Sequence, residues 1–568
     1  GGVNVSGTVA SSGTSGVILG DTDTPVYVNA NSTIGGSGTG TLDLGDVILV
    51  DDATLVVGTG VANTVNLDSV LGAAGNGQSN LAINTTGSVN VAESIRTDIG
   101  TVTITQSGGT TFADTVEATT VTLTDTTGTI AFQGNLTAGS LNTASQDYNV
   151  SLTGSSNTIT NDVSFVNTGS LTLGDASGDS TTFAGGVDAT TQSSISAQGS
   201  VSTTNAALDF GALTVANDTT FDSGSGNLTL GTVTITDDAD GTTLTLGTGG
   251  SGTIGLASLT GANAAAGVSN VTVNNTGTFS VGAVGTDIGT VTLTQTGGAT
   301  FSSSLSATTV TLTDTTGTIA FQGDLTAGSL NTASQDYNVS LTGSSNTITN
   351  AMTFSNSGTL SLGNAASDST TFTGGVTAIA PSNITIQGAV ASSGTSGITL
   401  GDGNTGLTVS ANTTIGGTGT GTLDLGDVTL ADGATLTIGT GIGNAINLDA
   451  VTGTANGASS NVTLNTTGVV NVAEAVGTDI GVLTLTQSGG TTFADTVEAT
   501  TVTLTDTTGT IAFQGNLTAG SLNTASQDYN VSLTGSSNTI TNDVSFVNTG
   551  SLTLGDASGD STTFAGGV

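Results

Sequence analysis

The chain has 568 residues, of which 42 are acidic and one, Arg96, is basic; it has no lysine, histidine or cysteine. This balance excludes a nucleic-acid partner, because phosphate binding depends on Lys and Arg, and the lack of Cys excludes disulfides and thiolate metal sites. Hydrophobic residues make up 35% of the chain and charged residues only 8%, which favours an ordered chain over a disordered one. No run of 18 apolar residues occurs, so we expect no direct membrane insertion.

A long unit of about 190 residues occurs three times along the chain. The segment TDIG begins at Thr97, Thr286 and Thr478, and residues 105–187 are identical to residues 486–568. We expect one continuous structure within a longer array rather than three separate folds, because only neighbouring repeats touch in a solenoid. The predicted repeats are residues 1–187, 188–376 and 377–568.

Short segments that alternate apolar and polar residues fill each repeat. In the first repeat the apolar positions are, in chain order, Val121 and Leu123, Ile130 and Phe132, Tyr148, Val150 and Leu152, and Leu171 and Leu173. This period of two predicts half-buried strands, and the intervening segments DTTG, TGSS and DASGD predict turns. No segment shows the 3.6-residue period of an amphipathic helix, so we expect essentially no α-helix.

A shorter beat of about 20 residues runs through the strands. A Phe is followed four residues later by Val or Leu and two residues after that by Ala, at Phe112, Phe132 and Phe183. Phe112 and Phe132 are 20 residues apart, and such a period is typical of solenoids.

We therefore predict an all-β fold, an elongated right-handed parallel β-helix with about 20–22 residues per coil and like residues stacked about 4.8 Å apart. The hand follows from the preference of parallel crossovers. Roughly 26–28 coils would make a rod about 130 Å long. The alternative is a row of tandem β-sandwich domains of about 95 residues each, because some Gly-rich sections blur the beat.

The line TTVTLTDTTGTIAFQGNLTAGSL, from Thr119, and the line SLTLGDASGDSTTFAGGV, from Ser170, resemble bacterial surface proteins of the filamentous-haemagglutinin-like and autotransporter-passenger type. The resemblance lies in the succession of strand, Gly-rich corner and strand, and it covers the whole chain. It implies a secreted, right-handed parallel β-helix that acts as an adhesin or a surface filament.

Carboxylates in turn-like segments are the candidate metal ligands. They are Asp175 and Asp179 in GDASGDS, the matching Asp556 and Asp560, and Asp237, Asp238 and Asp240 in DDADG. Ca²⁺ takes six to eight oxygen ligands from flexible loops, so Ca²⁺ is the candidate cofactor, although the segments do not match EF-hand spacing. The alternative is that these Asp residues stabilise turns by bonding the backbone.

We expect no enzymatic activity and assign no catalytic residue. A glycosidase needs two carboxylates, and the nearest pairs are Asp175 with Asp179 and Asp21 with Asp23. Both pairs lie in turn-like segments, where Asp is common for backbone reasons. Three nearly identical repeats also argue against a single active site.

The sequence predicts a structural, non-catalytic region of an extracellular bacterial surface filament or adhesin stalk, secreted or held at the cell surface. One alternative is a surface-layer lattice protein, which the acidic, Thr-rich and Lys-poor composition resembles. The other is an ice-binding adhesin repeat, because TVTIT at Thr101 and TVTLT at Thr120 fit a Thr-x-Thr pattern.

Self-association is the expected partnership. The sequence begins and ends inside the repeat pattern, and uncapped solenoid ends carry unpaired backbone groups that act as templates for pairing. We expect contact end to end, or within a longer array, opposed at low salt by the net charge of −41. Cell-surface or extracellular matrix components are the other partners that an adhesin would have.

Overall fold

The computed structural model describes residues 1–236, 241–262, 268–455 and 457–568. These residues form 63 β-strands and no helix, from β1 (Val3–Val5) to β63 (Ser561–Phe564). They fall into two compact units: the N-terminal unit, residues 1–281 with 286–289, and the C-terminal unit, residues 282–285 with 290–568.

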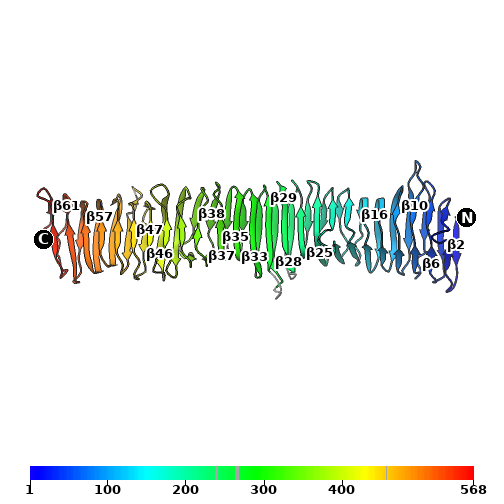
Figure 1. Ribbon diagram of the computed structural model, residues 1–568, viewed down its shortest axis with the longest axis horizontal. Coiled ribbons are helices and arrows are strands. Elements are labelled where there is room, and N and C mark those ends of the chain that lie inside the picture. The colour runs from blue at the N-terminus through cyan, green and yellow to red at the C-terminus, as the bar shows by residue number, and fades with distance from the viewer. Residues whose placement is uncertain (237–240, 263–267, 456) are drawn as a thin grey trace. The chain divides into compact units, whose positions relative to one another are not determined.

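Each unit is a parallel β-solenoid with about 21 residues per turn, and its strands lie side by side (Figure 1). The predicted all-β solenoid is confirmed, and the β-sandwich alternative is wrong. The hand of the coil, the continuity of the solenoid and the three repeat boundaries stay predictions.

One coil of the N-terminal unit shows how the sequence produces three sides. β15 (Thr110–Phe112) forms the first side, and β16 (Val116–Thr126) forms the other two. The start of β16 pairs with β13 (Ile95–Arg96), whereas its later residues pair with β14 (Ile99–Ser107). The chain therefore bends within β16 and passes from one side to the next without a loop.

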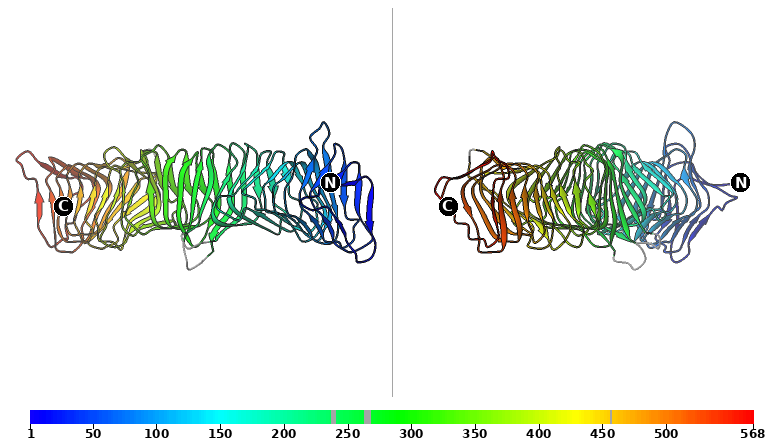
Figure 2. Two further views of the ribbon diagram at one scale, coloured as in Figure 1. Left: turned by 45° about the vertical axis from the view of Figure 1, so that its right-hand side comes forward. Right: turned by 60° about the vertical axis from the view of Figure 1, so that its left-hand side comes forward.

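The following coil repeats this arrangement in register. β17 (Thr129–Phe132) pairs with β15, and β18 (Leu136–Asn142) pairs with β16, both in parallel. Phe132 lies opposite Phe112 and Leu141 lies opposite Val121. Figure 2 shows successive strands within each unit following one another coil by coil.

Alternate residues of each strand point into the coil, as the period of two predicts. Val121 and Leu123 are fully buried, while the Thr residues between and beside them are partly exposed. Burying one such aliphatic side chain stabilises the fold by about 1.5–3 kcal/mol. β-branched Thr suits the outer surface because it fits a pleated strand. The interior columns are therefore the main source of stability.

Coil length varies because corner loops absorb extra residues. The Asn149 amide nitrogen donates to the Thr129 hydroxyl, 20 residues earlier and one coil away. In the Gly-rich section the Asn63 amide nitrogen donates to the Gly38 carbonyl, 25 residues earlier. The sequence beat of 20 residues thus describes the Phe-containing coils, and the Gly-rich coils are longer.

A buried Asn links three coils at one corner of the N-terminal unit. Asn157 is 1% exposed. Its Oδ1 accepts the backbone N–H of Leu136 at 3.0 Å, and its Nδ2 donates to the Gly154 carbonyl at 2.9 Å and to the Thr181 hydroxyl at 3.3 Å. In the C-terminal unit Asn346 and Asn538 make the equivalent hydrogen bonds.

Candidate functional site

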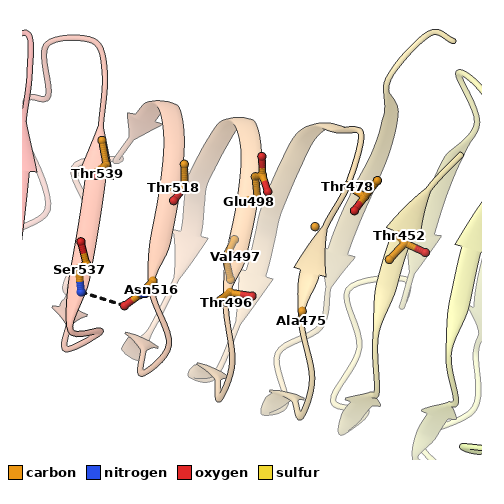
Figure 3. Close-up of a pocket in the computed structure, with 11 residues that line it drawn as sticks. Thr452, Ala475, Thr478, Thr496, Val497, Glu498, Asn516, Thr518, Ser537 and Thr539 are labelled. Carbon is orange, nitrogen blue, oxygen red and sulfur yellow. Dashed lines mark hydrogen bonds between the residues drawn. The ribbon is translucent and has the colours of Figure 1, made fainter. Parts of the chain in front are cut away.

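The largest hollow described in the C-terminal unit has a volume of about 460 Å³ and lies along one side of the coils. It crosses β51 (Val451–Gly453), β54 (Val476–Gly477), β57 (Val497–Thr507), β59 (Leu517–Asn523) and β61 (Ser537–Ile540). The lining side chains come from these successive strands and the turns before them (Figure 3): Thr452, Ala475, Gly477, Thr478, Thr496, Val497, Glu498, Asn516, Thr518, Ser537 and Thr539.

The hollow exists because small residues follow one another along this side. Gly477 has no side chain, and its neighbours one coil away, Thr452 and Glu498, flank the space that it leaves. The polar groups at one end are already paired, since the backbone N–H of Ser537 donates to Asn516 Oδ1 at 2.8 Å (Figure 3).

The chemistry of this lining is limited to hydrogen bonding. Glu498 is its one titratable side chain, and the rest are neutral Thr, Ser, Asn, Ala, Gly and Val. General acid–base or nucleophilic catalysis needs a second, positioned group beside the first. The arrangement therefore offers hydroxyls and one carboxylate to a polar ligand and contains no catalytic pair.

A neighbouring hollow of about 410 Å³ shares Glu498 and also contains Asp479. A hollow of about 460 Å³ in the N-terminal unit contains the matching residues Glu117 and Asp98. There Gln78 and Thr119 are hydrogen-bonded to each other across the hollow at 2.8 and 3.0 Å. This hollow recurs because the sequence around it recurs, and repetition alone assigns it no ligand.

Asp179, a calcium candidate from the sequence, serves the backbone of its own turn. Its side chain is 8% exposed, and its Oδ2 accepts the N–H groups of Asp175 and Ala176 at 2.8 and 2.9 Å. The carboxylate of Asp175, in contrast, belongs to an exposed residue. The two candidates thus share a turn in which one of the four carboxylate oxygens is already engaged.

The second repeat shows that this turn does not need two carboxylates. Asn364 takes the place of Asp175, and the Oδ2 of Asp368 still accepts the N–H groups of Asn364 and Ala365 at 2.8 and 2.9 Å. In the third repeat Asp560 makes the same two bonds, to Asp556 and Ala557. These backbone bonds hold the pKa of Asp560 below its usual value of 3.8.

The remaining calcium candidates, Asp237, Asp238 and Asp240, lie outside the described residues. Within the described residues no group of three or more Asp or Glu side chains is placed to hold a metal ion. Calcium binding therefore stays a prediction, and the backbone contacts above give the turn-stabilising role of Asp179 and Asp560 direct structural support.

The pair Asp21 and Asp23 also forms a turn. The Asp21 Oδ1 accepts the N–H of Asp23 at 3.0 Å, and Asp21 and Thr24 form an isolated antiparallel bridge. In the third repeat Asp402 accepts the N–H groups of Asn404 and Thr405 at 2.9 and 2.8 Å. Asp at these positions is explained by turn chemistry.

The sequence analysis missed a column of carboxylates that the coils bring together. Burial, and then the neighbouring charges of Asp46, Asp43 and Asp21, raise the pKa of Asp68. In the C-terminal unit burial raises the pKa of Asp449, followed by Asp427, Asp424 and Asp402. The signal was available, because the motif LDLGD and the later LD lie one coil apart in both repeats. We call these two groups of four the acidic columns.

Comparisons with known proteins assign no relative to this chain: no protein-family model, no curated protein and no solved structure matches it. In the part of the chain that the structure describes, no helix is long and apolar enough to cross a membrane.

Proposed function

We propose that this chain is the structural, non-catalytic repeat region of an extracellular bacterial surface filament or adhesin stalk, of the filamentous-haemagglutinin-like or autotransporter-passenger kind. The observation that carries the proposal is the in-register stacking of nearly identical coils, in which Phe132 covers Phe112 and each coil pairs only with its neighbours. Such a structure adds length by adding coils, because its stability is the sum of local terms.

The surface chemistry supports a spacer rather than a receptor. The hollows of the C-terminal unit are lined by small neutral residues around a single Glu498 or around Glu498 and Asp479. A high-affinity small-molecule site usually has apolar or aromatic walls with a few convergent polar groups. The absence of Lys and the single Arg96 also leave trypsin-like proteases one cleavage site, which suits a protein outside the cell.

The test is to locate the chain on the cells that make it. Antibodies against the chain should label intact cells as strongly as permeabilised cells, and proteinase K added outside should remove the label from intact cells. Label that appears only after permeabilisation, or that survives the protease until the cells are opened, would contradict an extracellular location.

Two alternatives give different results in parallel assays. A surface-layer protein would form a two-dimensional lattice on the cell surface in electron micrographs, whereas a stalk or filament would project from it. An ice-binding repeat would inhibit ice recrystallisation. The Thr-x-Thr ladder runs from Thr101 to Thr120 on the adjacent coil, but Ser140 and Asn142 follow on the next, so we expect no ice activity.

A further inference from the structure

The last coil of the C-terminal unit, residues 551–568, carries apolar side chains that no part of the described structure covers. Leu552 and Leu554 are 39% and 49% exposed, and Val568 is 77% exposed. Leu residues one coil earlier on the same side, such as Leu533, are fully buried. We call residues 551–568 the terminal coil.

The same sequence occurs in the N-terminal unit, where it is covered. Residues 170–187 are identical to the terminal coil. There Leu171 and Leu173 are fully buried, because β25 (Ser194–Thr203) pairs with β22 (Ser170–Leu173) in parallel. The exposure of Leu552 and Leu554 therefore comes from the missing neighbour and not from a different coil structure.

A second example lies within the C-terminal unit and shows which sequence covers this coil. Residues 359–376 match the terminal coil at every apolar position. They are covered by β44 (Asn383–Ser392) and β45 (Ile398–Leu400). Ile384 lies opposite Leu360, and Ile398 lies opposite Val376, and all four side chains are at most 3% exposed.

The first coil of this chain has the sequence of that cover. Residues 9–16 are identical to residues 390–397, and Val3, Val5 and Val17 stand where Ile384, Ile386 and Ile398 stand. Val3 pairs on one side only, with Val26 of the next coil. The first coil thus has one unpaired strand edge, and its inward residues are those that cover residues 359–376 in the C-terminal unit.

We propose that the terminal coil of one molecule binds the first coil of a second copy, in the register of residues 359–376 with residues 384–398. In this register Val3 of the second copy lies on Leu552, Val5 on Leu554 and Val17 on Val568. The contact continues the parallel hydrogen-bonding ladder and covers the exposed apolar residues. It uses two different surfaces, so each bound copy leaves one of each free and assemblies larger than a dimer form.

Charge sets the conditions for this contact. Two copies of a chain with a net charge of −41 repel each other at low ionic strength. At about 0.15 M salt the Debye length falls to about 8 Å, and repulsion between distant charges is largely screened. The interface itself is mostly neutral, since the matching residues are Val, Leu, Thr and Asn. Association should therefore increase with NaCl. The proposal goes beyond the proposed function, because it needs only the stacking register and no particular location of the protein.

Cysteine pairs test the register directly, since the chain has no Cys of its own. Ser361 lies opposite Thr385 in the covered coil, and the equivalent pair between molecules is Thr553 with Asn4. The T553C and N4C variants, mixed under mild oxidation, should form a disulfide-linked mixed dimer. The T553C and S6C variants, displaced by one position on the same outward face, should not. Equal mixed-dimer yields from N4C and S6C would overturn the register.

Sedimentation of the unaltered 568-residue chain tests the contact itself. Its mass should rise with protein concentration and with NaCl. The L552D/L554D variant should lose this association, while I379D, which changes an Ile that is 46% exposed far from the terminal coil in sequence, should keep it. Circular dichroism checks that both variants remain folded. A chain that stays monomeric at every concentration and salt level, or association that survives L552D/L554D, would overturn the proposal.

Discussion

Phe513 lies on Phe493 in the interior of the C-terminal unit, with ring centroids 4.9 Å apart and ring planes inclined by 10°. The two residues are direct partners in the pairing of β56 (Thr491–Phe493) with β58 (Gly509–Phe513). The pair Phe112 and Phe132 repeats this geometry in the N-terminal unit, at 4.8 Å and 14°. A spacing of 20 residues in the sequence has become one coil in space.

Truncation of this stack should destabilise its coil strongly. F513A removes a fully buried ring and should cost about 3–5 kcal/mol. F513L should cost less, because Leu533 occupies the same interior column one coil later. Hydrogen exchange of the β56 and β58 amides measures the local loss. The outward change A512S is the control, and F513A with exchange rates like those of A512S would contradict the stacked interior.

The buried Asn column should be sensitive to loss of one amide. N346A leaves the backbone N–H of Leu325 without the 3.0 Å bond to Asn346 Oδ1, so it should cost about 1–3 kcal/mol. Denaturant unfolding measures the difference. N350A is the matched control, because Asn350 is exposed and bonds only the Ser329 hydroxyl in the described contacts; its effect should stay within about 0.5 kcal/mol. Equal effects of the two variants would show that Asn346 has no structural role.

The acidic columns should cost stability at neutral pH. Burial and neighbouring carboxylates raise the pKa of Asp449 in the folded chain. A raised pKa gives stability that is present below the unfolded-state value near 3.8 and is lost as the pH rises through the folded-state value. D449N should therefore stabilise the chain at pH 7 by about 0.2–1 kcal/mol, and less as NaCl is added.

The control for D449N is D528N, which makes the same change of net charge at an exposed residue. Thermal unfolding at pH 7 and at a pH below 3.8 compares the two variants. We expect the advantage of D449N to shrink at the lower pH, where the carboxyl is protonated in both states. A D449N chain that is no more stable than D528N at pH 7 would rule out this repulsion.

Alkaline pH should unfold the chain through its buried tyrosines. Burial raises the pKa of Tyr337 to about 12, and its hydroxyl accepts the N–H of Ala333 at 3.0 Å. The folded-state pKa is raised, so this stability is complete below the unfolded value of about 10 and is lost as the pH rises toward 12. Absorbance titration of tyrosinate, compared between the unaltered chain and Y337F, measures the shift. A Tyr337 that ionises near pH 10 would contradict its burial.

The strands were predictable because the period of two is a local property. Val150 and Leu152 were expected to face inward, and both are fully buried. The coil was predictable from the repeated Phe at Phe112 and Phe132, since identical residues at a fixed spacing stack when each coil pairs with the next.

Features that depend on three dimensions escaped the sequence. Asn157 reads as a turn residue, and only the structure shows that its amide links three coils. Asp179 reads as a calcium ligand or a turn former, and the two N–H groups on its Oδ2 decide for the turn role. Asp68 could be placed beside Asp46 only when the longer, loop-containing coils were known, because a uniform 20-residue beat puts them out of line.

The most direct test of the account is a pair of engineered cysteines on adjacent coils. Thr501 and Ser521 are direct partners in the pairing of β57 with β59, whereas Asn523 pairs with Thr503. Strands one coil apart lie about 4.8 Å from each other, within the Cα separation of 4.4–6.8 Å that a disulfide needs. The T501C/S521C chain should therefore form an intramolecular disulfide in a redox buffer, while T501C/N523C should keep free thiols, as counted by mass after alkylation. Equal oxidation of the two, or oxidation of T501C/N523C alone, would contradict coils stacked in this register.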